Sequence, residues 1–463
     1  MSSFAGLNTA LSALRYNRVA MDVASGNIAN VGTAGYTRRT VNGEAVGAPD
    51  APAMWSRYSG AGDGVRVASV DRMADMLLDI RARREHGNQS YLDIRQSVLE
   101  RVESGIGEPG DTGVAAAIAD FRSAWHDLAN NPGSDAARSA LLGKAATLAD
   151  AIRIQARNVD SEAGDQRIRV NADVTEVNTV ASDLAATNKS IAVANLNGTD
   201  AGTLLDKRDQ LAMRLSELTG GTATARADGG FDYAVNGVAL VTGNTAGTMS
   251  VASGITSSGA ADGSPISFAI TDSSGTTAIP SGMLGEIGGV TDLLNTTLPA
   301  YLQGLDSIAQ QLADEINTQH QAGYDKNGNP GQPLFSYTAG SAASTIAVAL
   351  SAPADLAASG IPGGGLDSSN ATALATATGV EDSYQRLING FGTAVASVSR
   401  LAANQQVLTS QVDGSREQLS GVNLDEETVS MLASQHAYEA AARVMTTLDS
   451  VLDTLINRTG VTH

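Results

Sequence analysis

Histidine side chains are the first candidates for acid–base chemistry or zinc binding in this chain. The sequence has no H-E-x-x-H motif and no G-x-S-x-G motif, and it has no cysteine, so thiol nucleophiles and thiolate metal sites are excluded. The adjacent pair His126 and Asp127 is weak evidence for a site. The histidines are scattered along the chain, at His86, His126, His320, His436 and His463. The sequence therefore predicts no catalytic or metal site, and no cofactor is expected.

A second candidate is a cation-binding loop after residue 324. Asp325, Asn327 and Asn329 alternate like the start of a calcium loop. The sixth position is Pro330 rather than glycine, however, and the twelfth is Ser336 rather than glutamate. We therefore expect an Asx-rich turn, with a bound metal as the minor alternative.

Two further patterns have plain structural explanations. Residues 105–110, GIGEPG, match the Gly-x-Gly-x-x-Gly pattern of phosphate-binding loops, but they follow a predicted helix rather than a strand and include Pro109. We expect an ordinary loop there. Asp206 and Asp209 lie one helical turn apart, where a solvated face or an ion pair with Lys207 or Arg208 is expected.

The most regular apolar pattern lies in the last forty residues. Asn423 can cap a helix whose first turn carries the acidic residues Asp425, Glu426 and Glu427. A heptad stripe then runs along that helix; its large members are Met431, Tyr438, Met445, Leu448, Leu452 and Leu455. Such a narrow apolar stripe must be covered by another helix.

The best candidate for that covering helix is residues 3–30, at the opposite end of the chain. Its apolar residues have the same three-four spacing: Phe4, Leu7, Leu11, Leu14, Met21 and Ile28. We therefore predict that the two terminal helices pair as a coiled coil. From periodicity alone, an ordinary pair of core helices is an equal alternative.

Between these ends, helical patterns enclose a segment with strand periodicity. Helices are expected at about 72–103, 114–130, 134–218 with breaks, 283–322 and 381–420, and short strands or an extended connector at 37–70. The segment FDYAVNGVALVTG, with its Asn236-Gly237 turn, predicts a β-hairpin.

The predicted fold is therefore mainly α, a long-helix bundle with a β insertion. Residues 1–36 and 422–463 form the terminal coiled coil. Residues 37–220 and 283–421 form the helical body, with an irregular excursion at 336–380. Residues 221–282 form the inserted β domain. This nesting predicts that the termini lie together at one end and the insertion at the other.

Composition narrows the possible partners. The 463 residues are 42% hydrophobic but only 4% aromatic, which favours long Ala-rich helices. The 30 basic and 49 acidic residues give a net charge of −19, which argues against nucleic acid or an anionic membrane as partner. No apolar run approaches the roughly 20 residues needed to span a bilayer. The first residues lack the pattern of a secretory signal peptide.

Both ends resemble a known family. Residues 10–39, ALSALRYNRVAMDVASGNIANVGTAGYTRR, are similar to the opening signature of the flagellar axial proteins, which comprise rod, hook and hook-associated proteins. Residues 421–427, GVNLDEE, resemble the hook-associated form of the closing segment, and FRSAWHDLANNP at 121–132 resembles the form found at the hook–filament junction. Ala34 stands where the family usually has proline. The matching motif residues at the two ends are Asn27, Ile28, Ala29, Asn30, Gly35, Tyr36, Asn423, Asp425, Glu426 and Glu427.

The resemblance implies a structural role in the bacterial flagellum, without enzymatic activity. It implies a ring between hook and filament, in which the terminal stripes are an assembly seam. The implied partners are further copies of the chain, the hook protein, a second junction hook-associated protein and an export chaperone bound to the C-terminal helix. It also implies an extracellular location, reached by type III export without a cleaved signal. Because an isolated helix pair is marginal in water, residues 1–30 and 425–463 are expected to be mobile in the monomer and ordered on assembly.

Two alternatives remain open at this stage. The chain could be a hook or rod protein of the same family, although FRSAWHDLANNP and the long helical region at 72–218 disfavour this. It could also be a secreted enzyme or ligand-binding protein that carries axial-type ends. Only the insertion at 221–280 could hold such an activity, and that insertion is short and has no histidine.

Overall fold

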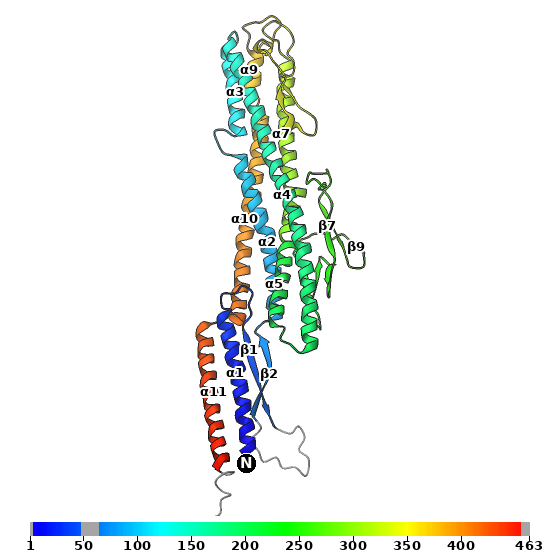
Figure 1. The fold of residues 1–463 in the computed structure, drawn as a ribbon. Coiled ribbons are helices and arrows are strands. Elements are labelled where there is room, and N and C mark those ends of the chain that lie inside the picture. The colour runs from blue at the N-terminus through cyan, green and yellow to red at the C-terminus, as the bar shows by residue number, and fades with distance from the viewer. Residues whose placement is uncertain (1–2, 48–63, 455–463) are drawn as a thin grey trace, which may run out of the picture.

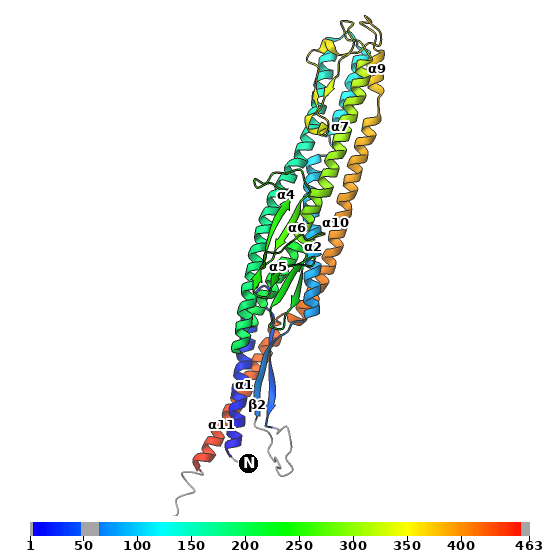
Figure 2. The ribbon, with the colours of Figure 1, turned by 90° about the vertical axis from the view of Figure 1, so that its right-hand side faces the viewer.

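The molecule is elongated, with a short rod at one end that continues into a long helical bundle (Figures 1 and 2). The computed structural model describes residues 3–47 and 64–454. Both terminal helices lie in the short rod, so the prediction that the ends of the chain come together is confirmed. No helix in the described ranges is long and apolar enough to cross a membrane.

The terminal rod consists of two helices and a hairpin. Helix α1 (Ser3–Ala29) runs antiparallel to α11 (Leu424–Asp453), and strands β1 (Arg39–Val46) and β2 (Gly64–Arg72) form an antiparallel hairpin beside α1. Ser12 fastens the hairpin, because its Oγ accepts a hydrogen bond from the Val65 amide at 3.2 Å. The predicted division gives residues 37–72 to the helical body, whereas this hairpin packs on α1.

The bundle is built from long helices of both halves of the chain, as expected. Helix α4 (Asp135–Asn197) is a single helix of 63 residues, about 95 Å long at 1.5 Å per residue, so the predicted break falls only after it. Ser134 caps its start, and Gly198 ends it in the left-handed conformation, with φ 63°. The other elements are α2 (Met76–Ile106), α3 (Val114–Asn130), α5 (Gly202–Thr219), α6 (Gly285–Asp292), a π-helical turn η1 (Leu293–Thr297), α7 (Leu298–Gln321) and α10 (Gly379–Ser420).

Two hydrophobic clusters follow each other along the bundle. The lower cluster joins α2, α5, α6 and the second half of α4, and the upper one joins α3, α7 and the first half of α4. Leu184 belongs to the lower cluster and Trp125 to the upper one, and both are fully buried. Since α4 and α7 contribute to both clusters, they tie the two cores into one rod.

The β insertion lies along the side of the bundle (Figure 1). It has a four-stranded sheet, β3 (Thr222–Ala225), β4 (Phe231–Val235), β5 (Val238–Thr242) and β6 (Thr245–Ala246), and a three-stranded sheet, β7 (Thr248–Ser253), β8 (Ser267–Thr271) and β9 (Thr277–Ala278). The predicted hairpin is confirmed, with Asn236 and Gly237 at positive φ between β4 and β5.

The predicted position of the insertion is wrong. Buried side chains of its strands, including Tyr233, Met249 and Phe268, belong to the lower cluster with α2 and α4. One face of each small sheet is apolar, and it is covered by the flank of the bundle rather than projecting beyond it.

The end of the bundle opposite the termini is formed instead by residues 322–378 together with α3 (Figures 1 and 2). This segment is largely irregular, as expected, with short elements only: β10 (Phe335–Ser336), α8 (Ala342–Thr345), β11 (Ala347–Val348), a 3-10 turn η2 (Pro353–Asp355) and α9 (Ser369–Thr376). Leu334, Phe335, Ile346 and Leu356 are buried and cover the upper cluster.

Candidate assembly interface and its joint

The C-terminal helix has the predicted cap and stripe. Asn423 Oδ1 accepts hydrogen bonds from the backbone amides of Asp425 (3.0 Å) and Glu426 (3.4 Å). Met431, Met445, Leu448 and Leu452 are half-buried on the side facing α1, whereas Tyr438 is 36% exposed. Leu455 lies outside the described residues.

The face of α1 that meets α11 differs from the predicted stripe. The fully buried apolar residues of α1 are Ala10 and Ala24, and Gly6 lies so close to α11 that a Cβ there would be 3.2 Å from Leu448 Cδ1. Small side chains let two helices approach closely, so the leucines flank the contact rather than fill it. Of the predicted residues, Leu7, Leu14, Met21 and Ile28 are half-buried, Leu11 is 36% exposed, and Phe4 lies in the first turn of α1 with its side chain outside the described part.

This contact shows pairing within one chain, and its part in assembly stays a prediction. The sequence does indicate the face of α1 that meets α11, because Gly6, Ala10 and Ala24 lie on one side of a helix. A search that weighs only large apolar residues misses it.

Asn27 joins the two terminal helices and the hairpin. Its side chain is fully buried; Nδ2 donates to Glu427 Oε2 at 3.0 Å and to the Arg39 carbonyl at 2.9 Å. Its Oδ1 accepts from the Tyr36 hydroxyl at 2.8 Å and from the Arg39 amide at 3.1 Å. Every buried polar atom of this amide therefore has a partner, which makes the position specific for asparagine.

Glu427 completes this arrangement. Arg38 Nε donates to Glu427 Oε1 at 2.7 Å, and Arg38 Nη1 donates to Glu426 Oε2 at 3.1 Å. The backbone amide of Arg38 donates to the Ser420 carbonyl at 2.9 Å. Glu427 is only 3% exposed, so these charge-assisted bonds form away from solvent. The structure thus brings together four of the motif residues, Asn27, Tyr36, Glu426 and Glu427.

The remaining motif residues have local roles or face solvent. Asn30 Nδ2 bonds to the Gly26 carbonyl at the end of α1, Asn423 caps α11, and Gly35 has a positive φ of 73°. Ala29 and Asp425 are exposed, and Ile28 is half-buried at the edge of the helix pair.

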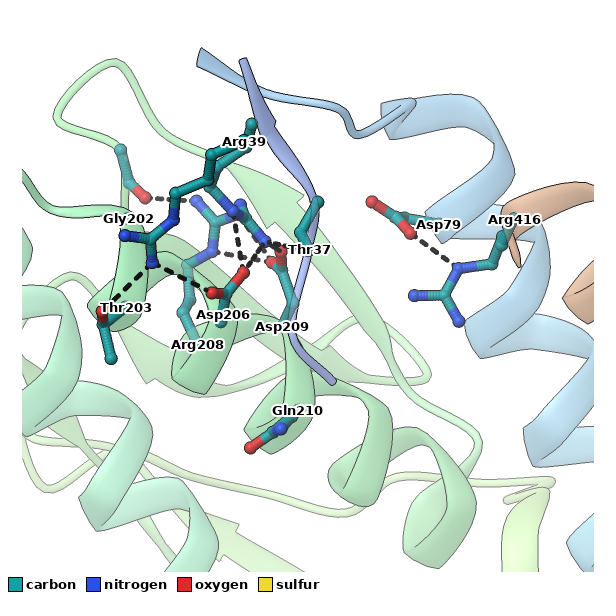
Figure 3. A network of polar contacts seen from close by, with 12 residues as sticks. Thr37, Arg39, Asp79, Gly202, Thr203, Asp206, Arg208, Asp209, Gln210 and Arg416 are labelled. Atoms are coloured by element: carbon teal, nitrogen blue, oxygen red, sulfur yellow. Dashed lines mark hydrogen bonds and ion pairs between the residues drawn. The ribbon is translucent and has the colours of Figure 1, made fainter. Parts of the chain in front are cut away.

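A second array of charges joins the hairpin to the bundle (Figure 3). Arg72 of β2 donates to Asp206 Oδ1 at 2.9 Å and to Asp209 Oδ2 at 2.8 Å, and it also bonds to Thr37 Oγ1 at 3.0 Å. Arg39 reaches the same helix through Asp206 at 3.4 Å and Thr203 at 3.1 Å.

This array corrects one expectation about α5. Asp206 is only 6% exposed and forms ion pairs with two arginines of the hairpin, Arg39 and Arg72. The expectation that Asp206 lies on a solvated helix face is therefore wrong. Asp209 does form the expected ion pair with Arg208, at 2.6 Å. Burial alone would lower the pKa of Arg72, but Asp209 and Asp206 outweigh burial and raise that pKa, so Arg72 remains charged.

A further ion pair and a small hollow lie beside these arginines. Arg416 Nε of α10 donates to Asp79 Oδ1 of α2 at 2.9 Å, which ties together the two helices that lead into the terminal rod (Figure 3). A hollow of about 220 Å³ lies next to this pair, with Gly35, Leu78 and Met213 among its lining residues. We call this region, where the chain passes between the bundle and the terminal rod, the joint. It consists of Arg39 and Arg72 with Asp206 and Asp209, and of Arg416 with Asp79.

No catalytic constellation emerges among the described residues. His126 and His436 are exposed on different helices, His463 lies outside the described residues, and His86 lies between Asp413 (3.0 Å) and Glu217 (3.7 Å). His320 is buried and engaged with backbone groups of Gln332 and Ala357. Within 3–47 and 64–454, no group of three or more His, Cys, Asp or Glu could hold a metal ion.

The two loop predictions hold. Asp325 Oδ1 accepts from the amides of Asn327 (2.7 Å) and Asn329 (2.8 Å), which is the expected Asx-rich turn. Gly105 and Ile106 are the last residues of α2, and residues 107–110 form the expected loop; the Glu108 carboxylate accepts a hydrogen bond from the Ala115 amide at the start of α3, at 2.9 Å.

Comparison with known proteins agrees with this architecture. Residues 99–335 match the family described as flagellar hook-associated protein FlgK helical domain. Residues 7–37 match the flagella basal body rod protein family, and residues 417–458 match the flagellar basal body rod FlgEFG protein C-terminal family. These two shorter matches cover most of α1 and all of α11, and they contain Asn27, Tyr36 and Glu427.

Two whole proteins are similar over nearly their full lengths and nearly the full length of this chain. The flagellar hook-associated protein 1 of Bacillus subtilis (strain 168) is 29% identical, over 99% of both chains. That of Escherichia coli (strain K12) is 25% identical, over 97% of this chain and 99% of the other.

A solved structure shares the fold. The flagellar hook junction protein FlgK from Burkholderia pseudomallei matches with a TM-score of 0.64 and 16% identity, over 73% of this chain and 100% of that chain. Because the helical-domain match alone spans half of the sequence, and both ends match flagellar rod families, this chain belongs to the flagellar hook-associated protein FlgK family.

Proposed function

We propose that this chain is a structural component of the bacterial flagellum at the junction between hook and filament, and that it acts by association rather than catalysis. Family membership and the names of its relatives support this role. The structural observation that carries it is the terminal rod, a helix pair fixed to the bundle through the joint. A rod fixed in this way holds the rest of the molecule at a set orientation when the rod is built into a filament.

In this proposal the terminal seam is the assembly element. Copies of the chain form a ring through their terminal rods, with the hook protein on one side of the ring and a second junction hook-associated protein on the other. The mature protein is extracellular and leaves the cell by flagellar type III export without a cleaved signal. An export chaperone covers the C-terminal helix beforehand, because its apolar residues are aggregation-prone when exposed.

We also propose a division of the chain that follows the structure more closely. The terminal unit comprises α1, the β1–β2 hairpin and α11; the bundle comprises α2 to α5 and α6 to α10; and residues 221–282 form a β unit on its flank. This division differs from the sequence-based one in moving residues 37–72 to the terminal unit.

The experiment is addition of purified protein to isolated hooks, followed by sedimentation and electron microscopy. Full-length protein is expected to cap hooks, and a truncation that lacks residues 425–463 is expected to stay soluble and unattached. A finer pair of variants is Met445→Asp, which puts a charge into the half-buried seam, and Thr446→Asp, which puts the same charge on the exposed neighbour. Only the first is expected to abolish capping.

The possible results separate two ideas. If the truncation and Met445→Asp cap hooks as well as the full-length protein, the seam is an intrachain core and not the assembly element. If the full-length protein does not bind hooks at all, the junction role itself is wrong.

Amide hydrogen exchange provides an independent check. In the monomer, amides of α1 and α11 are expected to exchange faster than those of α4, because the helix pair is isolated from the two main clusters. In the assembled state they are expected to be protected. Equal protection of α1 and α11 in monomer and assembly would contradict assembly-linked ordering.

The enzymatic alternative receives no support from the β insertion. A hollow of about 540 Å³ lies between β8 and α6, but polar groups that line it are engaged within the protein. Asn295 is bonded to the Ile266 backbone, and Asp292 pairs with Arg95 at 3.1 Å. We therefore do not propose a catalytic role for this insertion.

A further inference from the structure

Four polar side chains lie between the two hydrophobic clusters of the bundle. Gln155 comes from α4, Tyr301 from α7 and Tyr384 from α10, and Glu108 comes from the loop that joins α2 to α3 (Figure 1). Tyr301 belongs to the lower cluster and Tyr384 to the upper one, and Leu387 of α10 packs against both clusters. We call Glu108, Gln155, Tyr301 and Tyr384 the polar belt, because they lie at the level where the two cores meet.

Direct hydrogen bonds join three members of the polar belt. Gln155 Nε2 donates to Tyr384 Oη at 2.9 Å, and Tyr384 Oη donates to Glu108 Oε1 at 3.0 Å. The same Glu108 oxygen accepts from the Ala115 amide at 2.9 Å. Because Tyr384 gives its only hydroxyl hydrogen to Glu108, the Gln155 amide must donate to Tyr384 through Nε2. The oxygen of that amide, Oε1, is left as an acceptor.

Two polar atoms of the belt are not paired within the described part of the chain. Tyr301 Oη and Gln155 Oε1 are both buried, and neither has a hydrogen-bond partner there. Each of the two residues is only 3% exposed, so bulk solvent does not reach these atoms. An unpaired polar group in an apolar interior costs free energy. For that reason nearly all such groups in folded proteins are bonded to protein or to ordered water.

The two unpaired atoms have complementary roles. Burial, and after it the charge of Glu108, raises the pKa of Tyr301, so the Tyr301 hydroxyl keeps its hydrogen and acts as a donor. The Gln155 oxygen can only accept. A water molecule can accept from Tyr301 and donate to Gln155, and it has a second hydrogen for the nearby Glu108 carboxylate.

We propose that the polar belt is an internal water-binding site, in which one ordered water accepts a hydrogen bond from Tyr301 Oη and donates one to Gln155 Oε1. Its second hydrogen goes to Glu108. Three bonds are typical of a buried water, and folded proteins hold about one such water per 27 residues. This site rests on contacts inside one copy of the chain and does not depend on the junction role.

The bound water completes the belt. The direct bonds connect α4, α10 and the start of α3, but they leave out α7. The water adds α7 through Tyr301, so all the helices that meet at this level share one polar network. A fully paired buried network fixes the rotation and register of the helices that form it, which an apolar core does less strictly.

A crystal structure of the full chain, at a resolution that shows ordered water, tests the site directly. The expected result is a density peak within hydrogen-bond distance of both Tyr301 Oη and Gln155 Oε1. A direct hydrogen bond between these two atoms, or the lack of any peak between them, overturns the proposal.

The sign of a stability change provides a second test. Tyr301→Phe removes only the hydroxyl. If this hydroxyl holds the water, its loss leaves the water and Gln155 short of a bond, and the unfolding temperature is expected to fall by about 1 °C or more. If the hydroxyl is unpaired, phenylalanine fits the apolar surroundings better and the unfolding temperature rises. An unchanged or higher unfolding temperature of Tyr301→Phe therefore overturns the proposal.

Two further tyrosines calibrate this measurement. Tyr384→Phe removes a buried hydroxyl with two direct partners, Gln155 and Glu108, and is expected to lower the unfolding temperature. Tyr337→Phe removes a hydroxyl that bonds to Asp314 at the surface and is expected to change it by less than about 0.5 °C. Under the proposal, Tyr301→Phe behaves like Tyr384→Phe and not like Tyr337→Phe.

Discussion

The side-chain amide of Asn188 in α4 forms hydrogen bonds with both the backbone N–H and the backbone carbonyl of Phe231 in β4. Asn188 Oδ1 accepts from the Phe231 amide at 3.0 Å, and its Nδ2 donates to the Phe231 carbonyl at 2.7 Å. The side-chain amide thus acts like one residue of a neighbouring strand. Four other helix asparagines hold an extended residue in the same way: Asn27 with Arg39, Asn178 with Met249, Asn295 with Ile266, and Asn317 with Phe335. These pairs explain how short strands stay attached to helices that offer no strand edge.

Replacement of Asn188 by alanine is expected to lower the free energy of unfolding by about 2–3 kcal/mol, because it leaves the buried Phe231 amide and carbonyl without partners. Urea unfolding measures this loss. Ser190→Ala on the exposed side of the same helix is the control, with an expected change below about 0.5 kcal/mol. Equal effects of the two variants would contradict a specific role for the Asn188 amide.

Removal of the Arg72 charge is expected to weaken the joint. Arg72→Leu leaves Asp206 and Asp209 buried without this partner, which costs about 3–5 kcal/mol for a buried pair. A double-mutant cycle with Asp206→Asn is expected to give a coupling energy above about 1 kcal/mol. Arg66→Gln breaks an exposed pair with Glu44 and is expected to change stability by less than about 1 kcal/mol. Additive effects of Arg72→Leu and Asp206→Asn would show that the two residues are not coupled.

His320 is expected to make the bundle less stable at acid pH. Nδ1–H donates to the Gln332 carbonyl at 2.6 Å, and Nε2 accepts from the Ala357 amide at 2.9 Å, so the neutral ring fits its site. Burial lowers the pKa of His320 from 6.5 to about 4. A lowered folded-state pKa means that the unfolded chain takes up a proton first, so stability is lost as pH falls from about 6.5 to about 4.

The size of the His320 effect follows from its two pKa values. They correspond to a loss of about 3 kcal/mol across that interval. Urea unfolding at several pH values measures it. The variant His320→Gln is expected to be less stable at neutral pH but to show a shallower slope between pH 6.5 and 4. An unchanged slope would assign the pH dependence to other groups.

Asp173 is expected to act with the opposite sign. Burial, followed by the nearby Glu286, raises the pKa of Asp173 to about 6, and its Oδ2 is buried without a hydrogen bond. The ionised carboxylate therefore disfavours the folded state above pH 6, and this penalty disappears as pH falls through 6 towards 3.8. Asp173→Asn is expected to stabilise the protein by roughly 1 kcal/mol at pH 8 and to lose that advantage near pH 4, as measured by thermal melts. A constant advantage at both pH values would contradict this explanation.

The sequence predicts those parts of the structure that depend on neighbours along the chain. The Asn423 cap, the Asn236-Gly237 turn and the ends of α3 each depend on a few adjacent residues, and all three are found as expected. The pairing of the terminal helices could also be predicted, because each has an apolar row that needs a cover.

Contacts between distant residues could not be predicted in this way. Arg72 and Asp206 are 134 positions apart, and neither lies in a pattern that marks its partner. The closeness of α1 and α11 depends on small residues, Gly6, Ala10 and Ala24, which contribute little to an apolar pattern. The place of the β insertion depends on which flank of the bundle is apolar, a property of several packed helices together.

The joint also determines how the molecule responds to force. In the described part of the chain, only two covalent links connect the terminal rod to the bundle. Residues 73–75 join β2 to α2, and residues 421–423 join α10 to α11, so neither link is part of a continuous helix or strand. A twist applied to the terminal rod therefore reaches the bundle through side chains, chiefly Arg39 and Arg72 with their carboxylate partners Asp206 and Asp209. The torsional stiffness of the molecule is thus set by ion pairs rather than by a continuous helix, and because these pairs are largely buried, dissolved salt screens them only weakly.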